Sequence, residues 1–186
     1  MKRTVTVVLL LVLAGGCSTK ESASNNSNGN SNASQPGASA ETAQPAAHPA
    51  RDPSNLREGE ASGTIIDEGQ PIQLRYAYAG WGEQFDEEAV VLLLTDNPIP
   101  AERLARGFDE SFRIFSDDIR GLEYKIGKGF WVRYRPSQFQ TSGINTLKDY
   151  SVENNIVRSR DEDRTTFDGH EYKRSVSFIA RLPEKK

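Results

Sequence analysis

The sequence predicts an all-β domain: an antiparallel β-sandwich or partly open barrel of about six to eight strands with one or two short helices. Apolar residues between positions 61 and 186 recur mostly with a period of two, and turn residues interrupt them at intervals of roughly 8–15 residues. The strands are not separated regularly by helices, which argues against a doubly wound α/β fold. Residues 61–186 are enough for one domain with a single core.

The first strands are predicted to form a hairpin. Residues 63–66 and 72–78 flank the turn residues Asp67-Glu68-Gly69. Alternation in the second run predicts one face with Ile72, Leu74, Tyr76 and Tyr78, and the other with Gln73, Arg75 and Ala77.

The middle and the end of the domain contain the other strands. Residues 89–94 are continuously apolar, which predicts a strand buried on both faces. Residues 122–126 and 130–135 are joined by Gly127-Lys128-Gly129, which predicts a second hairpin turn. Residues 172–182 alternate as a last strand, and residues 156–160 form a weaker one.

One short helix is predicted over residues 101–106, because Pro100 precedes it and Gly107 follows it. It has about two turns and depends on packing for its stability. Residues 110–119 fit either a second short helix or a strand.

Residues 17–60 are predicted to be a disordered tether in front of the domain. Their composition of Ser, Asn, Ala, Gly, Gln and Pro buries too little apolar surface to offset the entropy of ordering. They contain no aromatic residue, and Leu56 is their only large aliphatic residue. His48 is expected to be exposed there.

Residues 1–16 have the features of a cleaved export signal: the basic residues Lys2 and Arg3, a short apolar run and small residues before the cut. The apolar run is about half the ~20 residues that a membrane-spanning helix needs. The run ends in Leu13-Ala14-Gly15-Gly16-Cys17, and Cys17 is the only cysteine.

This arrangement resembles the processing site of bacterial lipoprotein precursors. Ala14 stands where that family usually has Leu. The resemblance implies cleavage after Gly16 and a diacylglycerol thioether on Cys17, an anchor strong enough for stable membrane attachment. Ser18 then implies sorting to the outer membrane in a diderm host. The alternative is cleavage of the same bond by the ordinary signal peptidase, which leaves Cys17 as a free thiol.

The domain itself loosely resembles uncharacterised bacterial envelope β-sandwich proteins. Two stretches carry the resemblance, Gly63-x-Ile65-Ile66 with the strand after it, and Phe167-x-Gly169-x-x-Tyr172 with the final strand. It implies no reaction, no cofactor and no functional residue.

Charge limits the class of partner. The chain has a net charge of −3, and the loss of Lys2 and Arg3 with the signal makes it more negative. A mildly acidic chain is not typical of nucleic-acid binding. The partners expected are a membrane, reached through Cys17, and an envelope protein or a glycan.

The candidate ligand surface consists of Trp81, Trp131, Arg133 and Arg135. Alternation places Trp131, Arg133 and Arg135 on one face of their strand, opposite Val132 and Tyr134, and two arginines suggest that this face is the outer one. An exposed Trp beside Arg can stack on a sugar or hold a peptide. The alternative is that Trp131 covers the edge of the core while the arginines pair with acids.

Signals for catalysis are weak. His170 is the only histidine after residue 60, and the neighbouring Asp168-Gly169 predicts that it lies in a solvated turn. Acidic clusters at residues 86–88, 117–118 and 161–163 lack the spacing of a known calcium loop, and the last is expected at a hairpin tip. We therefore expect a non-catalytic binding or assembly module; the alternatives are a glycan- or peptidoglycan-binding protein and a hydrolase centred on His170.

Overall fold

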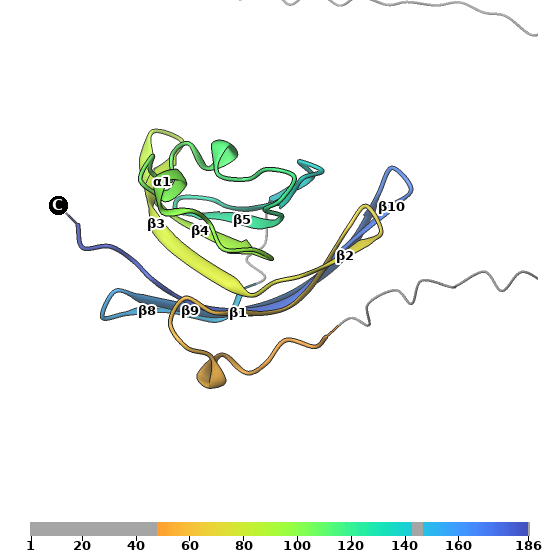
Figure 1. The fold of residues 1–186 in the computed structure, drawn as a ribbon, viewed down its shortest axis with the longest axis horizontal. Helices are drawn as coiled ribbons and strands as arrows, with labels where there is room; N and C mark the ends of the chain where they lie inside the picture. The colour runs from red at the N-terminus through yellow and green to blue at the C-terminus, as the bar shows by residue number, and fades with distance from the viewer. Residues whose placement is uncertain (1–47, 143–146, 186) are drawn as a thin grey trace, which may run out of the picture. The chain divides into compact units, whose positions relative to one another are not determined.

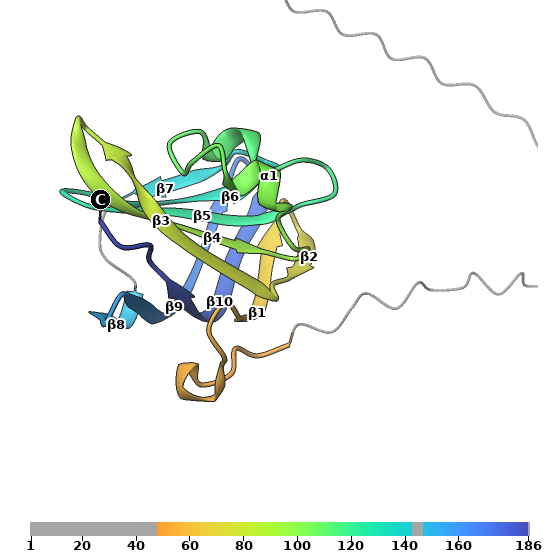
Figure 2. The ribbon, with the colours of Figure 1, turned by 60° about the vertical axis from the view of Figure 1, so that its left-hand side comes forward.

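The structure, a computed structural model, describes residues 48–142 and 147–185, apart from the side chain of Phe112. The predicted signal, Cys17 and the tether as far as residue 47 lie outside these ranges. Two antiparallel sheets of five strands each form a sandwich (Figures 1 and 2). The predicted all-β class is confirmed.

The first sheet has the order β2–β1–β10–β9–β8. Its strands, in chain order, are β1 (Ala61–Asp67), β2 (Gln70–Gln73), β8 (Leu147–Glu153), β9 (Ile156–Phe167) and β10 (His170–Arg181). Tight hairpins connect β1 to β2, β8 to β9 and β9 to β10. The residues in their turns have positive φ angles, as at Asn154 and Asn155, which is typical of two-residue hairpin loops.

The second sheet has the order β3–β4–β5–β6–β7. Its strands are β3 (Tyr76–Gln84), β4 (Glu87–Thr95), β5 (Gly121–Ile126), β6 (Phe130–Arg135) and β7 (Gln140–Ser142). The predicted turn at residues 127–129 is confirmed, and the amide of Gly127 donates to the carbonyl of Gly129 at 3.0 Å.

Ten strands are present in the described residues, more than the six to eight predicted. β7 is too short and polar to give a sequence signal, and β8 has no clean apolar alternation. The run at residues 72–78 is divided between β2 and β3 rather than forming one strand of a hairpin.

The predicted alternation over residues 72–78 is wrong after Leu74. Ile72 and Leu74 are buried, but Ala77 and Ala79 then take the core positions, and Tyr78 packs on the other face of its sheet. The chain leaves the first sheet after β2 and enters the second at β3, so the alternation starts again in a new phase.

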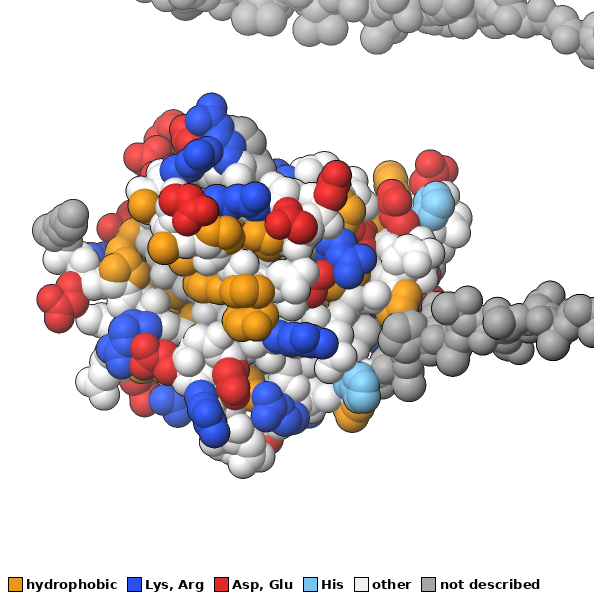
Figure 3. All heavy atoms as spheres, in the orientation of Figure 1, with side chains coloured by type: hydrophobic (Ala, Val, Ile, Leu, Met, Phe, Trp, Pro, Cys, Tyr) orange, Lys and Arg blue, Asp and Glu red, His pale blue; other side chains and the backbone are white. Residues whose placement is uncertain are grey.

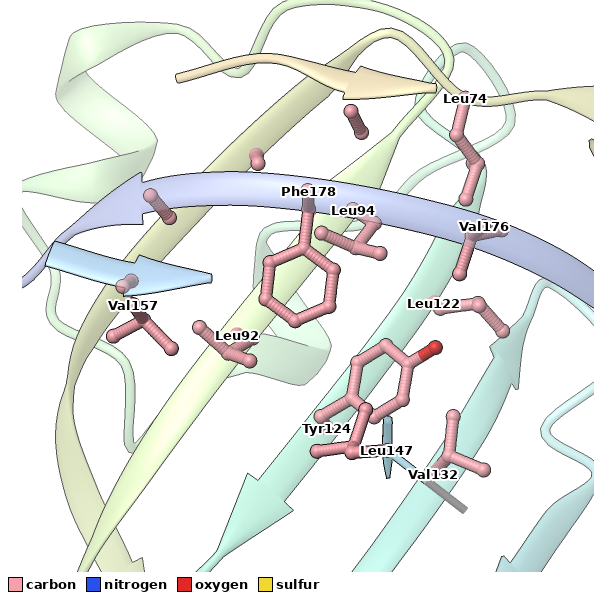
Figure 4. Packing of buried hydrophobic residues seen from close by; sticks show 14 of the residues in the cluster. Leu74, Leu92, Leu94, Leu122, Tyr124, Val132, Leu147, Val157, Val176 and Phe178 are labelled. Carbon is pink, nitrogen blue, oxygen red and sulfur yellow. The ribbon is translucent and has the colours of Figure 1, made fainter. Parts of the chain in front are cut away.

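The main core lies between the two sheets, where Phe178 of β10 faces Leu92 of β4 and Tyr124 of β5 (Figure 4). β4 is buried on both faces, as predicted: Leu92 lies in this core, whereas Val91 and Leu93 contribute to a second cluster on the opposite face. We call the second group the outer cluster.

Residues 96–120, the covering segment, complete the outer cluster with Ile99, Ile114 and Ile119. The segment carries α1 (Ala101–Leu104) and the 3-10 turn η2 (Ser111–Arg113). The predicted helix is therefore present but shorter than predicted. Of the two alternatives for residues 110–119, the structure shows the short helix, as the 3-10 turn η2, and no strand; an isolated bridge joins Ser116 and Ile119.

Residues 48–60 pack on the first sheet and contain the 3-10 turn η1 (Pro53–Asn55). The His48 amide donates to Oγ1 of Thr64 at 3.1 Å, the Ser177 hydroxyl donates to the Arg51 carbonyl, and Leu56 is buried. The packed chain therefore begins before the predicted boundary at residue 61. The side chain of His48 is exposed, as predicted.

Candidate functional site

The two tryptophans of the predicted surface point to opposite faces of the second sheet. Trp81 lies opposite Val90 in the β3–β4 register and packs against the main core. Trp131 lies opposite Lys125, which in turn lies opposite Val91 of the outer cluster. Directly paired residues share a face of a sheet. The predicted four-residue surface is therefore not a single site.

Trp81 is half-buried at the edge of the sandwich, where its ring contacts the C-terminal tail. Its indole Nε1 donates to the carbonyl of Pro183 at 2.9 Å. The ammonium of Lys185 lies 4.3 Å from the centre of the ring. These contacts occupy both the polar edge and the ring system of the side chain.

Arg135 is buried, so its predicted place on an exposed ligand surface is wrong. It is 2% exposed and pairs with the carboxylate of Glu123 at 2.5 Å, and that carboxylate also accepts from Ser111. The covering segment lies over this part of the outer face, with the ring of Phe115 5.5 Å from the guanidinium. A local pattern of alternation cannot show that a distant segment will cover a strand.

Trp131 and Arg133 remain together on the outer face, whereas Val132 and Tyr134 point into the core as predicted. The guanidinium of Arg133 lies 4.8 Å from the centre of the Trp131 ring, and the ammonium of Lys125 lies 5.5 Å from it. Two cations therefore already stack on this ring.

Trp131 and Arg133 border a groove of about 430 Å³, which we call the Trp131 groove. Arg133 is oriented by two hydrogen bonds to Oε1 of Gln140, at 2.7 and 3.2 Å. Phe85 projects beside it from the β3–β4 turn; its side chain is 74% exposed and its φ is +55°. A bulky residue in this left-handed conformation is uncommon. The groove thus combines aromatic surface with polar groups.

A polar cluster that was not predicted from the sequence lies inside the sandwich. Arg174 of β10 is 1% exposed and pairs with the fully buried Asp161 of β9 and, at 2.8 Å, with Asp163. From the second sheet, the Tyr124 hydroxyl donates to Asp161 Oδ2 at 3.0 Å, and the Tyr134 hydroxyl lies 3.5 Å from Arg174. The cluster therefore links the two sheets through their centre.

The residue pattern contained a signal for this cluster. Arg174 alternates in phase with Tyr172, Val176 and Phe178, which already indicated an inward-facing arginine. The prediction that residues 161–163 lie at a hairpin tip is wrong, because they lie within β9 and Asp161 pairs with Val176 of β10. A buried charge needs a partner, and the acidic run supplies it.

Both phenols of the cluster stay protonated over the ordinary pH range. Burial raises the pKa of Tyr124 well above its usual value, and the charge of Asp161 raises it further. Burial also raises the pKa of Tyr134 to about 12, although the positive charge of Arg174 partly opposes this. The protonated Tyr124 hydroxyl thus donates to the Asp161 carboxylate, whereas the Tyr134 hydroxyl accepts from the Arg174 guanidinium.

The other candidate groups lie at the surface. His170 is exposed and follows the tight turn at Asp168-Gly169, the place that the sequence predicted. Within residues 48–142 and 147–185, no three His, Cys, Asp or Glu side chains are grouped closely enough to hold a metal ion.

In the part of the chain that the structure describes, no helix has both the length and the apolar character needed to cross a membrane. Comparison with protein-family models, with curated proteins and with solved structures finds no match to this chain.

Proposed function

We propose that this protein is an exported lipoprotein, held on a membrane by a diacylglycerol on Cys17, and that its β-sandwich is a non-catalytic binding or assembly module of the cell envelope. The observation that carries the proposal is Gly15-Gly16-Cys17 directly behind a short apolar run with a basic start. In a diderm host, Ser18 favours the outer membrane.

The chemistry of the domain supports binding rather than catalysis. The strongest ionic groups, Arg174 with Asp161 and Arg135 with Glu123, are at most 2% exposed and are already paired with each other. A substrate cannot reach the first pair without opening the sandwich, or the second without displacing the covering segment. The accessible features are instead grooves beside aromatic side chains, such as the Trp131 groove.

Replacing Cys17 with Ala in the full-length chain is expected to abolish labelling by a radioactive fatty acid and to release a soluble or unprocessed form. Two acyl chains give stable anchoring, and without them no lipid holds the chain on the membrane. Labelling of whole cells followed by immunoprecipitation measures this directly. Persistent labelling of the Cys17→Ala protein would refute the anchor.

Crosslinking of intact cells that express the wild-type chain tests the binding role. A stoichiometric envelope protein recovered with the chain supports an assembly module. Recovery of muropeptides without protein supports the second candidate below, and recovery of neither would contradict a binding role.

The second candidate is a glycan- or peptidoglycan-binding lipoprotein that uses the Trp131 groove. The groove places three aromatic rings beside the side chains of Arg133, Gln140 and Ser142, a combination suited to the faces and hydroxyls of a sugar. Arg133 and Lys125 lie over the Trp131 ring, so a sugar that stacks there displaces at least one of them.

If the second candidate is correct, Trp131→Ala will lose cosedimentation with purified peptidoglycan by at least about tenfold, because stacking on an aromatic ring is the main apolar contact available. Trp131 is only partly buried, so the melting temperature is expected to fall by less than about 5 °C. Trp131→Phe keeps an aromatic face and is the matched control. A large loss of stability with unchanged sedimentation would instead make Trp131 a core residue.

A further inference from the structure

The outer edge of β3 carries backbone groups that no strand of the sheet pairs. β3 is an edge strand: it stands at one end of its sheet, next to β4. The Ala77 amide points away from β4, because it donates to the Gly59 carbonyl at 2.9 Å, and the Glu83 amide donates to Oδ1 of Asp109 at 2.9 Å. Alternation directs the backbone groups of Ala79 and Trp81 to the same side. Within the residues that the structure describes, no strand pairs this short stretch between the two closed ends, and Ala79 in its middle is 6% exposed.

An apolar groove of about 450 Å³ lies along this stretch. It is lined by β3 and the covering segment and, on the remaining side, by Gly59, Pro183 and the ion pair of Glu58 with Arg181; the β3 and covering-segment residues are Ala77, Tyr78, Ala79, Leu104 and Phe108. Figure 3 shows hydrophobic side chains gathered in the middle of this face, over β3 and the segment that carries α1, with charged side chains around them. Apolar surface beside open backbone groups is the arrangement that an added strand covers.

The end of the open edge near the β3–β4 turn is acidic. A smaller hollow of about 260 Å³ there is lined by Trp81 and by five carboxylates, those of Glu83, Asp86, Glu87, Glu88 and Asp109. Three lysines contribute positive charge: Lys128 pairs with Glu87, Lys185 pairs with Glu88, and the Lys125 ammonium donates to the Glu83 carbonyl at 3.1 Å. The acidic charge thus exceeds the basic charge that neutralises it.

The C-terminal tail shows which chemistry fits this end. After β10, the chain passes Trp81, whose indole donates to the Pro183 carbonyl, and Lys185 then pairs with Glu88 at 2.5 Å while its ammonium stacks on the Trp81 ring. Figure 2 shows this tail leaving the sandwich beside β3. A backbone carbonyl and a lysine therefore already occupy the acidic end of the edge.

We propose that the open edge of β3 and its apolar groove bind an extended peptide segment of an envelope partner, apolar over the groove and basic where it meets the acidic end. This rests on the proposed role as a binding module and names its surface and the chemistry of its partner. The peptide adds as a strand to Ala79 and Trp81, and its basic side chain competes with Lys185 for Glu88. An extended peptide offers backbone groups at the spacing of a strand edge, which neither a sugar nor a lipid chain does.

The test uses the full-length protein in detergent micelles and a fluorescein-labelled octapeptide of alternating valine and leucine that ends in two lysines. Its counterpart has two glutamates in place of the lysines. In fluorescence anisotropy, we expect saturable binding of the basic peptide and at least about tenfold weaker binding of the acidic one. No binding of the basic peptide, or equal binding of both, would overturn the proposal.

Ala79→Pro removes one outward amide without removing a bond between β3 and β4, and proline is tolerated on edge strands. This substitution is expected to weaken the binding of the basic peptide at least about tenfold. Lys185→Ala is expected to strengthen the binding of the same peptide several-fold. Val152→Ala, at an exposed position of β8 in the first sheet, is the matched control and should leave binding unchanged. Equal loss of binding in Ala79→Pro and in this control would overturn the proposal.

Hydrogen exchange tests the site without any substitution. Adding the basic peptide to the wild-type protein should slow exchange of the Ala79 and Trp81 amides at least about tenfold, because an added strand bonds to them. Peptide binding without this protection would overturn strand addition. If Cys17 is labelled and crosslinks form elsewhere on the domain, the inference fails while the proposed function stands.

Discussion

Arg174→Met is expected to destabilise the folded protein by about 3–5 kcal/mol, as measured by chemical denaturation. Methionine fills similar space but leaves the carboxylate of Asp161 without its cationic partner, at a position where that residue has no exposed surface. The negative charge of Asp161 is then no longer balanced by the Arg174 guanidinium, in a protein interior that solvates ions poorly. Since the Tyr124 hydroxyl also donates to Asp161, the loss acts on both sheets.

Arg164→Met is the matched control, because Arg164 lies on the neighbouring strand and pairs with Glu171 at the surface, where its side chain is 71% exposed. Removal of that surface ion pair is expected to lower the free energy of unfolding by no more than about 1 kcal/mol. The double variant Arg174→Met with Asp161→Leu should recover at least half of the loss, since an apolar pair of similar volume often replaces a buried ion pair. Equal costs for Arg174→Met and Arg164→Met would contradict a structural role for the cluster.

Gly121→Ala is expected to lower the free energy of unfolding by about 3–5 kcal/mol, because it adds both backbone strain and a steric clash. Gly121 begins β5 with a φ of +156°, and a Cβ there would lie 1.8 Å from the carbonyl oxygen of Leu94. That atom belongs to the backbone of β4, the neighbouring strand, so no side-chain rotation relieves the clash. The two strands would have to separate where the covering segment returns to the sheet.

Gly69→Ala is the control that distinguishes the effect of the steric clash from the effect of the positive φ angle. Gly69 also has a positive φ, +79°, but nothing lies within 4 Å of a Cβ placed on it. Its substitution should cost only about 1–2 kcal/mol, the ordinary penalty for a left-handed residue. The difference in stability between the two variants, taken from their melting curves, gives the contribution of the steric clash. Similar melting curves would contradict the predicted clash at Gly121.

Local signals in the sequence were reliable where the structure depends on neighbours in the chain. The turn at residues 127–129, the doubly buried strand β4 and the turn before His170 are all as predicted. The phase of residues 72–78 failed because the chain changes sheets there. Nothing in a run of alternating residues marks the point at which its strand acquires new neighbours.

The candidate surface failed for the same physical reason. Trp131 lies in the predicted strand 130–135, whereas Trp81 lies beyond the predicted run 72–78 although the structure places it within β3. The register of the second sheet turns the two side chains to opposite faces. Arg135 occupies an outward position on β6, as predicted, but the covering segment buries it against Glu123. The acidic run at residues 161–163 predicts a turn when only its neighbours in the chain are considered. Its partner, Arg174, lies on another strand and becomes visible only in the structure.

The sequence by itself determined the all-β class, most strand positions and the hairpin turns, because alternation and turn chemistry depend on adjacent residues. The lipoprotein prediction at Cys17 likewise depends on a contiguous run of residues. The tertiary structure alone decided which strands share a sheet, that Arg174 and Asp161 meet between the sheets, and that no strand in the described residues pairs with the outer edge of β3. These features depend on pairing between residues far apart in the chain, and such contacts have no local signature.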